Sequence, residues 1–175
     1  CFVLDLDNTL WGGVVGEDGV SGISVGDTYP GNAFMLFQEN LIEASKNGII
    51  LTVCSKNNQA DIEEVWEKNP FVKLNKNHLS AYRINWQNKA VNIAEMAAEL
   101  NIGLDSFVFI DDNPAERLLV KQTLPEVTVP DFPDEPYEME MFFRKVMEDH
   151  FQIYSLTNED KNKTRQYKEN YNRKS

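Results

Sequence analysis

The order of short apolar runs and helical stretches is the feature that most constrains how this chain can fold. Four apolar runs have the length of strands, at residues 1–6, 49–54, 107–110 and 127–129. Such runs are typical of strands buried on both faces of a sheet. Apolar residues at helical spacing predict helices at 32–47, 59–68, 90–100, 114–124, 137–149 and 158–172. The alternation predicts an α/β fold with a doubly wound, mostly parallel sheet.

The chain length and a proline-rich stretch predict one catalytic core followed by a helical extension. A chain of 175 residues suits a single α/β domain, which we expect to occupy residues 1–130. A proline-rich, acidic stretch at 130–136 marks a boundary, and residues 131–175 are expected to form a C-terminal helical extension. The chain opens inside a strand without an initiator Met. We therefore expect a longer protein, with another domain before or after this extension.

Two segments of the core have less regular patterns. Residues 11–31 are rich in glycine and predict a small β-hairpin flap, with its turn at Asp18-Gly19. No insertion is long enough for a large cap domain. Residues 70–86 are expected to be irregular, with one short strand near Val72.

The net charge excludes some classes of binding partner, and the cysteines indicate the cellular compartment. The net charge of −11 and the pI of about 4.6 make nucleic acid and anionic membranes poor partners. The sequence contains no signal peptide and no apolar run that would span a bilayer. Cys1 and Cys54 both lie in apolar runs, as expected of buried free thiols, so a cytoplasmic location is predicted.

Acidic pairs follow two of the predicted strands. Asp5 and Asp7 end the first apolar run, and their i, i+2 spacing directs both carboxylates to one face. Asp111 and Asp112 end the third run. Close carboxylates repel one another unless a cation neutralises them, and a hard cation prefers such oxygen ligands. The alternatives are a solvated strand end and a helix cap at Asn113.

A hydroxyl and a lysine complete the set. Ser55 ends the second apolar run, where its hydroxyl would bind a phosphate oxygen beside a helix start, although serine is also a common turn residue. Lys89 stands at a predicted helix start, where its charge opposes the helix dipole. This unfavourable position suggests that the charge has another role in the protein; the alternative is a solvated side chain. Parallel strands bring their carboxyl ends to one edge. The set therefore predicts phosphoryl transfer, in which one carboxylate attacks phosphorus and the other moves the proton.

These motifs resemble those of the haloacid dehalogenase (HAD) superfamily, which has a Rossmann-like core. The resemblance covers residues 1 to about 130 and rests on the order Asp5-x-Asp7-x-Thr9, Ser55, Lys89 and Asp111-Asp112. It implies that Asp5 is the nucleophile, which forms an aspartyl phosphate, and that Asp7 is the general acid and base. The product of such a site is inorganic phosphate, so the resemblance implies a phosphatase.

The resemblance also implies the roles of the remaining residues. Ser55, Lys89 and Thr9 would form the phosphate-binding group, within which Thr9 would orient Asp7. Mg²⁺ would be the cofactor. Its ligands would be Asp5, the backbone carbonyl of Asp7 and Asp111, with Asp112 binding the ion directly or through water.

A narrower likeness is to the FkbH-like branch, HAD subfamily IIIC. It is carried by residues 7–19, by 83–86 with Lys89, and by 109–117. Some members of that branch load a glyceryl unit from a bisphosphorylated glycerate onto an acyl carrier protein. Such loading needs a carrier or cysteine thiol. Cys54 is the only internal thiol, and its place in a strand favours a core role.

Two functions of other classes remain as alternatives. A receiver domain gathers similar residues, but its acidic pair precedes the phosphorylated aspartate, which is the opposite of the order here. A non-catalytic module that binds a phosphorylated ligand is the second alternative.

The partners follow from the flap. A flap covers a site only in part, which favours a carrier-bound or macromolecular phosphorylated substrate, or a pocket completed by another domain of the same polypeptide. Trp11 would pack either against that partner or in the core.

Overall fold

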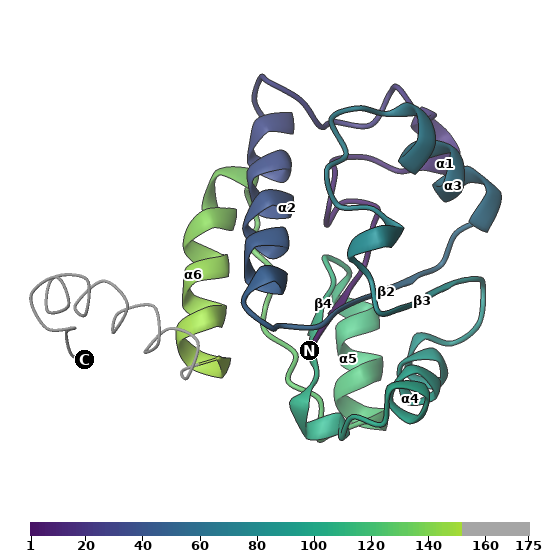
Figure 1. Ribbon diagram of the computed structural model, residues 1–175, viewed down its shortest axis with the longest axis vertical. Coiled ribbons are helices and arrows are strands. Elements are labelled where there is room, and N and C mark those ends of the chain that lie inside the picture. Colours follow the sequence, from purple (N-terminus) through teal and green to yellow (C-terminus); the bar gives the residue numbers. More distant parts are fainter. Residues whose placement is uncertain (152–175) are drawn as a thin grey trace, which may run out of the picture. The chain divides into compact units, whose positions relative to one another are not determined.

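A parallel sheet forms the centre of the computed structural model, which describes residues 1–151 (Figure 1). The sheet belongs to the compact unit Cys1–Glu140. Its strands are β1 (Phe2–Leu4), β2 (Leu51–Ser55), β3 (Ala81–Ile84) and β4 (Val108–Ile110). They run parallel in the order β3-β2-β1-β4, so all four carboxyl ends lie at one edge.

The predicted helices are confirmed within the described residues. The longer helices are α2 (Gly31–Lys46), α3 (Gln59–Lys68), α4 (Lys89–Leu100), α5 (Pro114–Thr123) and α6 (Met139–His150). Shorter helical turns are α1 (Val15–Asp18), η1 (Lys76–His78), η2 (Leu104–Ser106) and η3 (Pro136–Glu138). The predicted helix at 158–172 lies outside the described residues. The predicted division of the chain at residue 130 stays a prediction.

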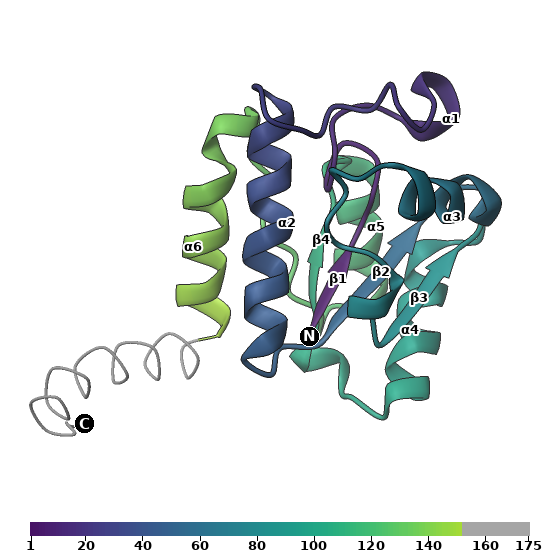
Figure 2. The same cartoon turned by 45° about the horizontal axis from the view of Figure 1, so that its top comes forward.

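The strand order explains why the sheet is covered on both faces. The chain moves in one direction from β1 to β2 to β3, so right-handed crossovers place α2 and α3 on one face. It then returns across the sheet to β4, which places α4 on the other face. Figure 2 shows α2 and α5 on opposite sides of the strands. The doubly wound α/β fold is therefore confirmed, and no large cap is inserted among the described residues.

Alternating side chains of the strands fill the two layers. Val3, Cys54 and Phe109 belong to one buried cluster with Ile93 of α4 and Val120 of α5. The residues on either side of Val3 are as fully buried as Val3 itself, so β1 is packed on both faces. Burial raises the pKa of the Cys54 thiol to about 12, and the thiol is a core group as expected.

Asparagine side chains cap the N-termini of α4 and α5, the two helices that begin near the carboxyl edge of the sheet. Asn88 caps α4 by accepting hydrogen bonds from the N–H groups of Ala90 and Val91. Asn113 does the same for α5 through the N–H of Ala115, and Pro114 supplies the first helical residue. Asn88 precedes Lys89 and Asn113 follows Asp112, so each cap lies next to a predicted site residue.

Two strand predictions are wrong. Residues 127–129 form a single bridge between Thr128 and Val108 and no strand. The stretch before Trp86 holds β3, whereas no strand forms near Val72. β3 pairs only with β2, at the edge of the sheet, where Tyr82 and Arg83 stay partly exposed. An edge strand of this kind lacks the continuous apolar pattern that identified the others.

The predicted hairpin flap is also wrong. Residues 11–31 contain the single helical turn α1 and one antiparallel bridge, between Gly12 and Ser24. The Asp18 carboxylate accepts a 2.8 Å hydrogen bond from the N–H of Val14, which closes a compact turn in place of a hairpin. Trp11 is fully buried, so its role is in the core and not against a partner.

None of the described helices is long and apolar enough to cross a membrane.

Candidate active site

Polar side chains from β2, from α4 and α5, and from the loops after β1 and β4 line one cavity of 240 Å³ at the carboxyl edge of the sheet. The predicted site residues among them are Asp5 and Asp7 after β1, Ser55 at the end of β2, Lys89 at the start of α4, and Asp111 and Asp112 after β4. The structure therefore brings together every predicted site residue except Thr9, which is buried beneath the cavity.

Lys89 is enclosed by two carboxylates. Its Nζ lies 3.1 Å from Asp5 Oδ1 and 2.6 Å from Asp111 Oδ2. The three side chains are at most 10% exposed, so the interpretations as a solvated lysine and a solvated strand end are wrong. A lysine in the first turn of a helix opposes the dipole. The two carboxylates are what stabilise its charge at that position.

Burial shifts the pKa values of all three groups. It raises the pKa of Asp5 to about 6, and Lys89 offsets part of that effect. It raises the pKa of Asp111 to about 7, with a further rise from the charge of Asp5. Burial acts to lower the pKa of Lys89, but the carboxylates of Asp5 and Asp111 outweigh it and hold that pKa above its ordinary value. Lys89 is therefore the fixed cation of the site.

Three carboxylates lie close enough to share a cation. One oxygen each of Asp5, Asp111 and Asp112 falls within 4.8 Å of the others. Burial also raises the pKa of Asp112, and the charge of Asp111 adds to the rise. One ammonium against three carboxylates leaves an excess of negative charge, which a divalent cation would neutralise. An all-oxygen set of this kind fits Mg²⁺.

Thr9 does not orient Asp7. Its hydroxyl lies 3.1 Å from Asp112 Oδ1 and 3.5 Å from Asp5 Oδ2, and it accepts a hydrogen bond from the Asp112 N–H. Thr9 is fully buried and does not line the cavity. The hydroxyl therefore joins the loop after β1 to the loop after β4, beneath the place predicted for the phosphate.

Asp7 is positioned by neutral donors. Its Oδ1 accepts 3.0 Å hydrogen bonds from Trp11 Nε1 and from the Val15 N–H. Its Oδ2 accepts a 2.9 Å bond from Asn57 Nδ2, and the same amide donates to Ser55 Oγ at 3.0 Å. The environment of Asp7 thus differs from that of Asp5, which is paired with a buried cation.

Several supporting residues were missed by the sequence reasoning. Asn57 follows Ser55 by two positions in the same loop, and that spacing was the available signal. Arg117 donates from Nη1 to the carbonyls of Asp111 and Asp112 at 2.9 and 3.0 Å, so it holds the acidic loop in place. Arg117 stands on α5, five positions after Asp112, and the motif at 109–117 that it closes had assigned it no role.

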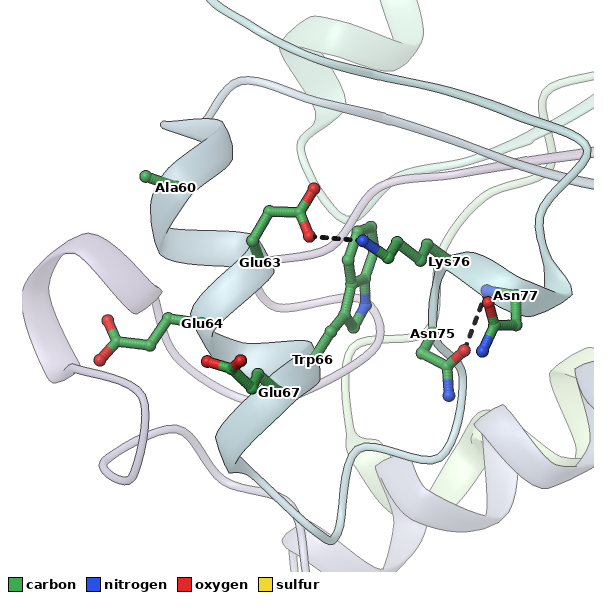
Figure 3. A pocket seen from close by; sticks show the side chains of 8 residues that line it. All are labelled: Ala60, Glu63, Glu64, Trp66, Glu67, Asn75, Lys76 and Asn77. Carbon is green, nitrogen blue, oxygen red and sulfur yellow. Dashed lines mark hydrogen bonds and ion pairs between the residues drawn. The ribbon is translucent and has the colours of Figure 1, made fainter.

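A larger cavity, of 540 Å³, lies between α3 and η1, away from these residues. Figure 3 shows the ion pair of Glu63 with Lys76 at its wall, with an Nζ–Oε1 distance of 3.0 Å. The carboxylates of Glu64 and Glu67 lie on the same helix. The described residues that line this larger cavity include no buried carboxylate pair, so its chemistry differs from that of the strand-end site.

Comparison with solved structures gives a fold relative of this chain. The N-terminal part of the protein BF1531 from Bacteroides fragilis, which contains a phosphatase domain and was crystallised with Mg, is 46% identical, with a TM-score of 0.80. The match covers 82% of this chain but only 39% of that one. The chain shares the fold of that phosphatase domain. No family model and no curated protein matches it.

More distant structures carry the HAD name. A HAD family enzyme from Bacteroides thetaiotaomicron, in complex with magnesium and inorganic phosphate, is 11% identical with a TM-score of 0.48, over 64% of this chain and 56% of that one. A HAD-like hydrolase from Xanthomonas campestris is 12% identical with a TM-score of 0.46, over 86% and 93%. The parallel strand order of this chain and the 46% identical phosphatase domain therefore remain the basis for its fold.

Proposed function

We propose that this chain is a Mg²⁺-dependent phosphatase domain of the HAD type, which works through an aspartyl phosphate at Asp5. The observation that carries the proposal is the buried ion pair of Asp5 and Lys89 beside Asp111 and Asp112. The charged and polar residues of the 240 Å³ cavity suit a phosphoryl group better than an apolar ligand. The Mg-bound phosphatase domain that is 46% identical supports it.

In the first step, a carboxylate oxygen of Asp5 attacks phosphorus as the bond to the leaving oxygen breaks. Asp7 gives its proton to that oxygen, and the alcohol departs. In the second step, Asp7 takes a proton from water, which attacks phosphorus and breaks the bond to Asp5. Inorganic phosphate is released, and both aspartates return to their starting states.

The other residues of the site stabilise charge. The Lys89 ammonium faces the nucleophile and would balance the charge of the transferring group. Mg²⁺, held by Asp5, the Asp7 carbonyl, Asp111 and Asp112, would neutralise the phosphate oxygens when bound. Ser55 lines the cavity and would donate a hydrogen bond to one of them.

Phosphate release from acetyl phosphate and from 4-nitrophenyl phosphate tests the proposal. We expect turnover that needs Mg²⁺ and that Asp5→Asn abolishes. Trapping of the acyl phosphate with hydroxylamine, followed by peptide mass spectrometry, should place the adduct on Asp5. Tight binding of phosphate esters without turnover would favour the non-catalytic module, and a stable aspartyl phosphate would favour a receiver domain.

A second candidate is glyceryl loading of the FkbH-like kind, with an acyl carrier protein as partner. The observation that favours it is the exposed Trp86, which belongs to the matching motif at 83–86. Trp86 is 67% exposed and is oriented by a 3.0 Å hydrogen bond from Nε1 to Asn58 Oδ1. Transfer of a glyceryl unit from a bisphosphorylated glycerate to a carrier protein would separate this function from hydrolysis.

The wider context of the domain is also a proposal. The chain spans 39% of the matched Bacteroides fragilis chain, so we propose that other domains of the same polypeptide, in the cytoplasm, deliver or complete the phosphorylated substrate. Activity of the isolated domain compared with that of the full-length protein tests this.

A further inference from the structure

The catalytic cavity is small and open at the surface, so a large leaving group would extend beyond it. Its 240 Å³ are lined by charged and amide side chains, together with Ser55. These groups suit the phosphoryl end of an ester and not an organic body. The rest of the ester must extend into a neighbouring space.

A second cavity adjoins the first. It measures 420 Å³ and shares two lining residues with the catalytic cavity, Asn8 and Asp112. Asn8 lies in a left-handed turn, with φ of 59°, and its carboxamide accepts a hydrogen bond from the Gly13 N–H. The boundary between the two cavities is therefore formed by a fixed turn and one of the acidic residues of the site.

Six of the eleven residues that line the second cavity are apolar. Phe34 of α2, Phe132 and Met139 face it, together with three prolines, Pro114, Pro133 and Pro136. Among the described residues that line it, the one cation is Arg117, whose Nη1 donates to the carbonyls of Asp111 and Asp112. The exposed Asp134 and Glu135 add negative charge at the rim. An anionic organic group is disfavoured there, and an uncharged one is favoured.

We infer that this second cavity is the leaving-group pocket of the enzyme, and that it takes an uncharged apolar or aromatic group attached to the phosphate. The inference rests on the proposed phosphatase function and adds the substrate class to it. Phe132 would contact the organic group without touching the phosphate, since it lines the second cavity but not the first.

The opposite side of the site offers a rival path. Trp86 is exposed and follows Asn85, whose N–H is bonded to the Ser55 carbonyl at 3.1 Å. A leaving group directed that way would stack on an open indole face and not enter a cavity. The two paths depend on different aromatic residues, so single substitutions distinguish them.

Calorimetric binding of phenylphosphonate and methylphosphonate in the presence of Mg²⁺ tests the inference without turnover. Both carry the same head, and only the phenyl compound reaches the pocket. We expect phenylphosphonate to bind at least about tenfold more tightly, because the ring is buried against aromatic and aliphatic side chains. Phe132→Ala should remove most of that advantage and leave methylphosphonate affinity unchanged.

Two further variants serve as controls. Leu118→Ala alters an exposed residue of α5 outside the cavity and should change neither affinity. Trp86→Ala should also leave the phenyl advantage intact, and its loss in that variant would overturn the inference in favour of the rival path. Equal wild-type affinities for the two phosphonates would overturn the inference alone. Failure of both to bind would overturn the proposed phosphate site with it.

Discussion

Removal of the Lys89 charge should destabilise the metal-free protein, and the size of the effect should depend on pH. In Lys89→Met the side chain keeps its length, but the carboxylates of Asp5 and Asp111 lose the ammonium at 3.1 and 2.6 Å. A lysine at a helix start opposes the dipole, so the sequence alone suggests a gain in stability. The two buried partners reverse that expectation, because breaking a buried ion pair leaves charge without compensation.

The magnitude follows from the proton that replaces the lysine charge. The variant can avoid a buried, unpaired carboxylate by binding one more proton than the wild type. Protonating an aspartate with an unfolded pKa of about 3.9 costs about 1.4 kcal/mol per pH unit, hence about 4 kcal/mol at pH 7 and about 1.5 kcal/mol at pH 5. A folded-state pKa raised above the unfolded value makes stability fall as pH rises. The loss in the variant should therefore grow from pH 5 to pH 7.

Urea unfolding of both proteins in EDTA, at pH 5, 6 and 7, measures this difference in the free energy of unfolding. Excess Mg²⁺ should recover part of the loss at pH 7, since a bound cation replaces the missing positive charge. Exposed Lys46→Met, whose lysine pairs with Glu43 at 3.9 Å, is the matched control and should change stability little. A variant as stable as the wild type at pH 7, or a loss that does not change with pH, would refute the reasoning.

Four further predictions concern catalysis and the metal. Asp5→Asn should lower the rate of phosphate release by more than about 10³-fold with the fold intact by circular dichroism; a rate within about tenfold of wild type would exclude Asp5 as nucleophile. Mg²⁺ should be required and Ca²⁺ should replace it poorly in the same assay, whereas full activity in excess EDTA would contradict a metal site. Mg²⁺ affinity, measured calorimetrically, should rise with pH through the pKa values of about 6 for Asp5 and about 7 for Asp111, because protons compete for the same oxygens; an affinity constant across that range would contradict those shifts. Asn57→Ala should lower kcat by about tenfold with little change in KM, since it frees Asp7 Oδ2, and an effect on KM alone would assign Asn57 to substrate binding.

The parts of the fold that were predictable are those in which local pattern and burial coincide. β1, β2 and β4 are packed on both faces, so their apolar runs were unambiguous and the acids after β1 and β4 marked where they end. β3 lies at the edge, and its half-exposed residues gave no such run. Residues 11–31 were misassigned because their glycines suit any tight turn. The choice of a helical turn depends on contacts such as that of Asp18 with Val14.

The site was predictable as a set of residues but not as a set of contacts. The strand-end positions of Asp5 and Asp111 follow from local sequence. The position of Lys89 between them could not be predicted in the same way. Lys89 is 84 positions from Asp5 and 22 from Asp111, and the order of the strands brings the three together. Thr9 shows the same limit: it was expected to orient the nearby Asp7, but it bonds to Asp112, 103 positions away.

The two aspartates of the first motif have environments that suit different roles. Asp5 is desolvated, and its carboxylate is held 3.1 Å from the Lys89 ammonium, a fixed cation. Asp7 accepts hydrogen bonds only from the neutral N–H groups of Trp11, Val15 and Asn57. The Asp7 carboxylate therefore lies among neutral donors, whereas the Asp5 carboxylate lies against the Lys89 ammonium. The proposed mechanism uses this difference, with Asp5 beside the ammonium as the nucleophile and Asp7 among neutral donors as the acid and base.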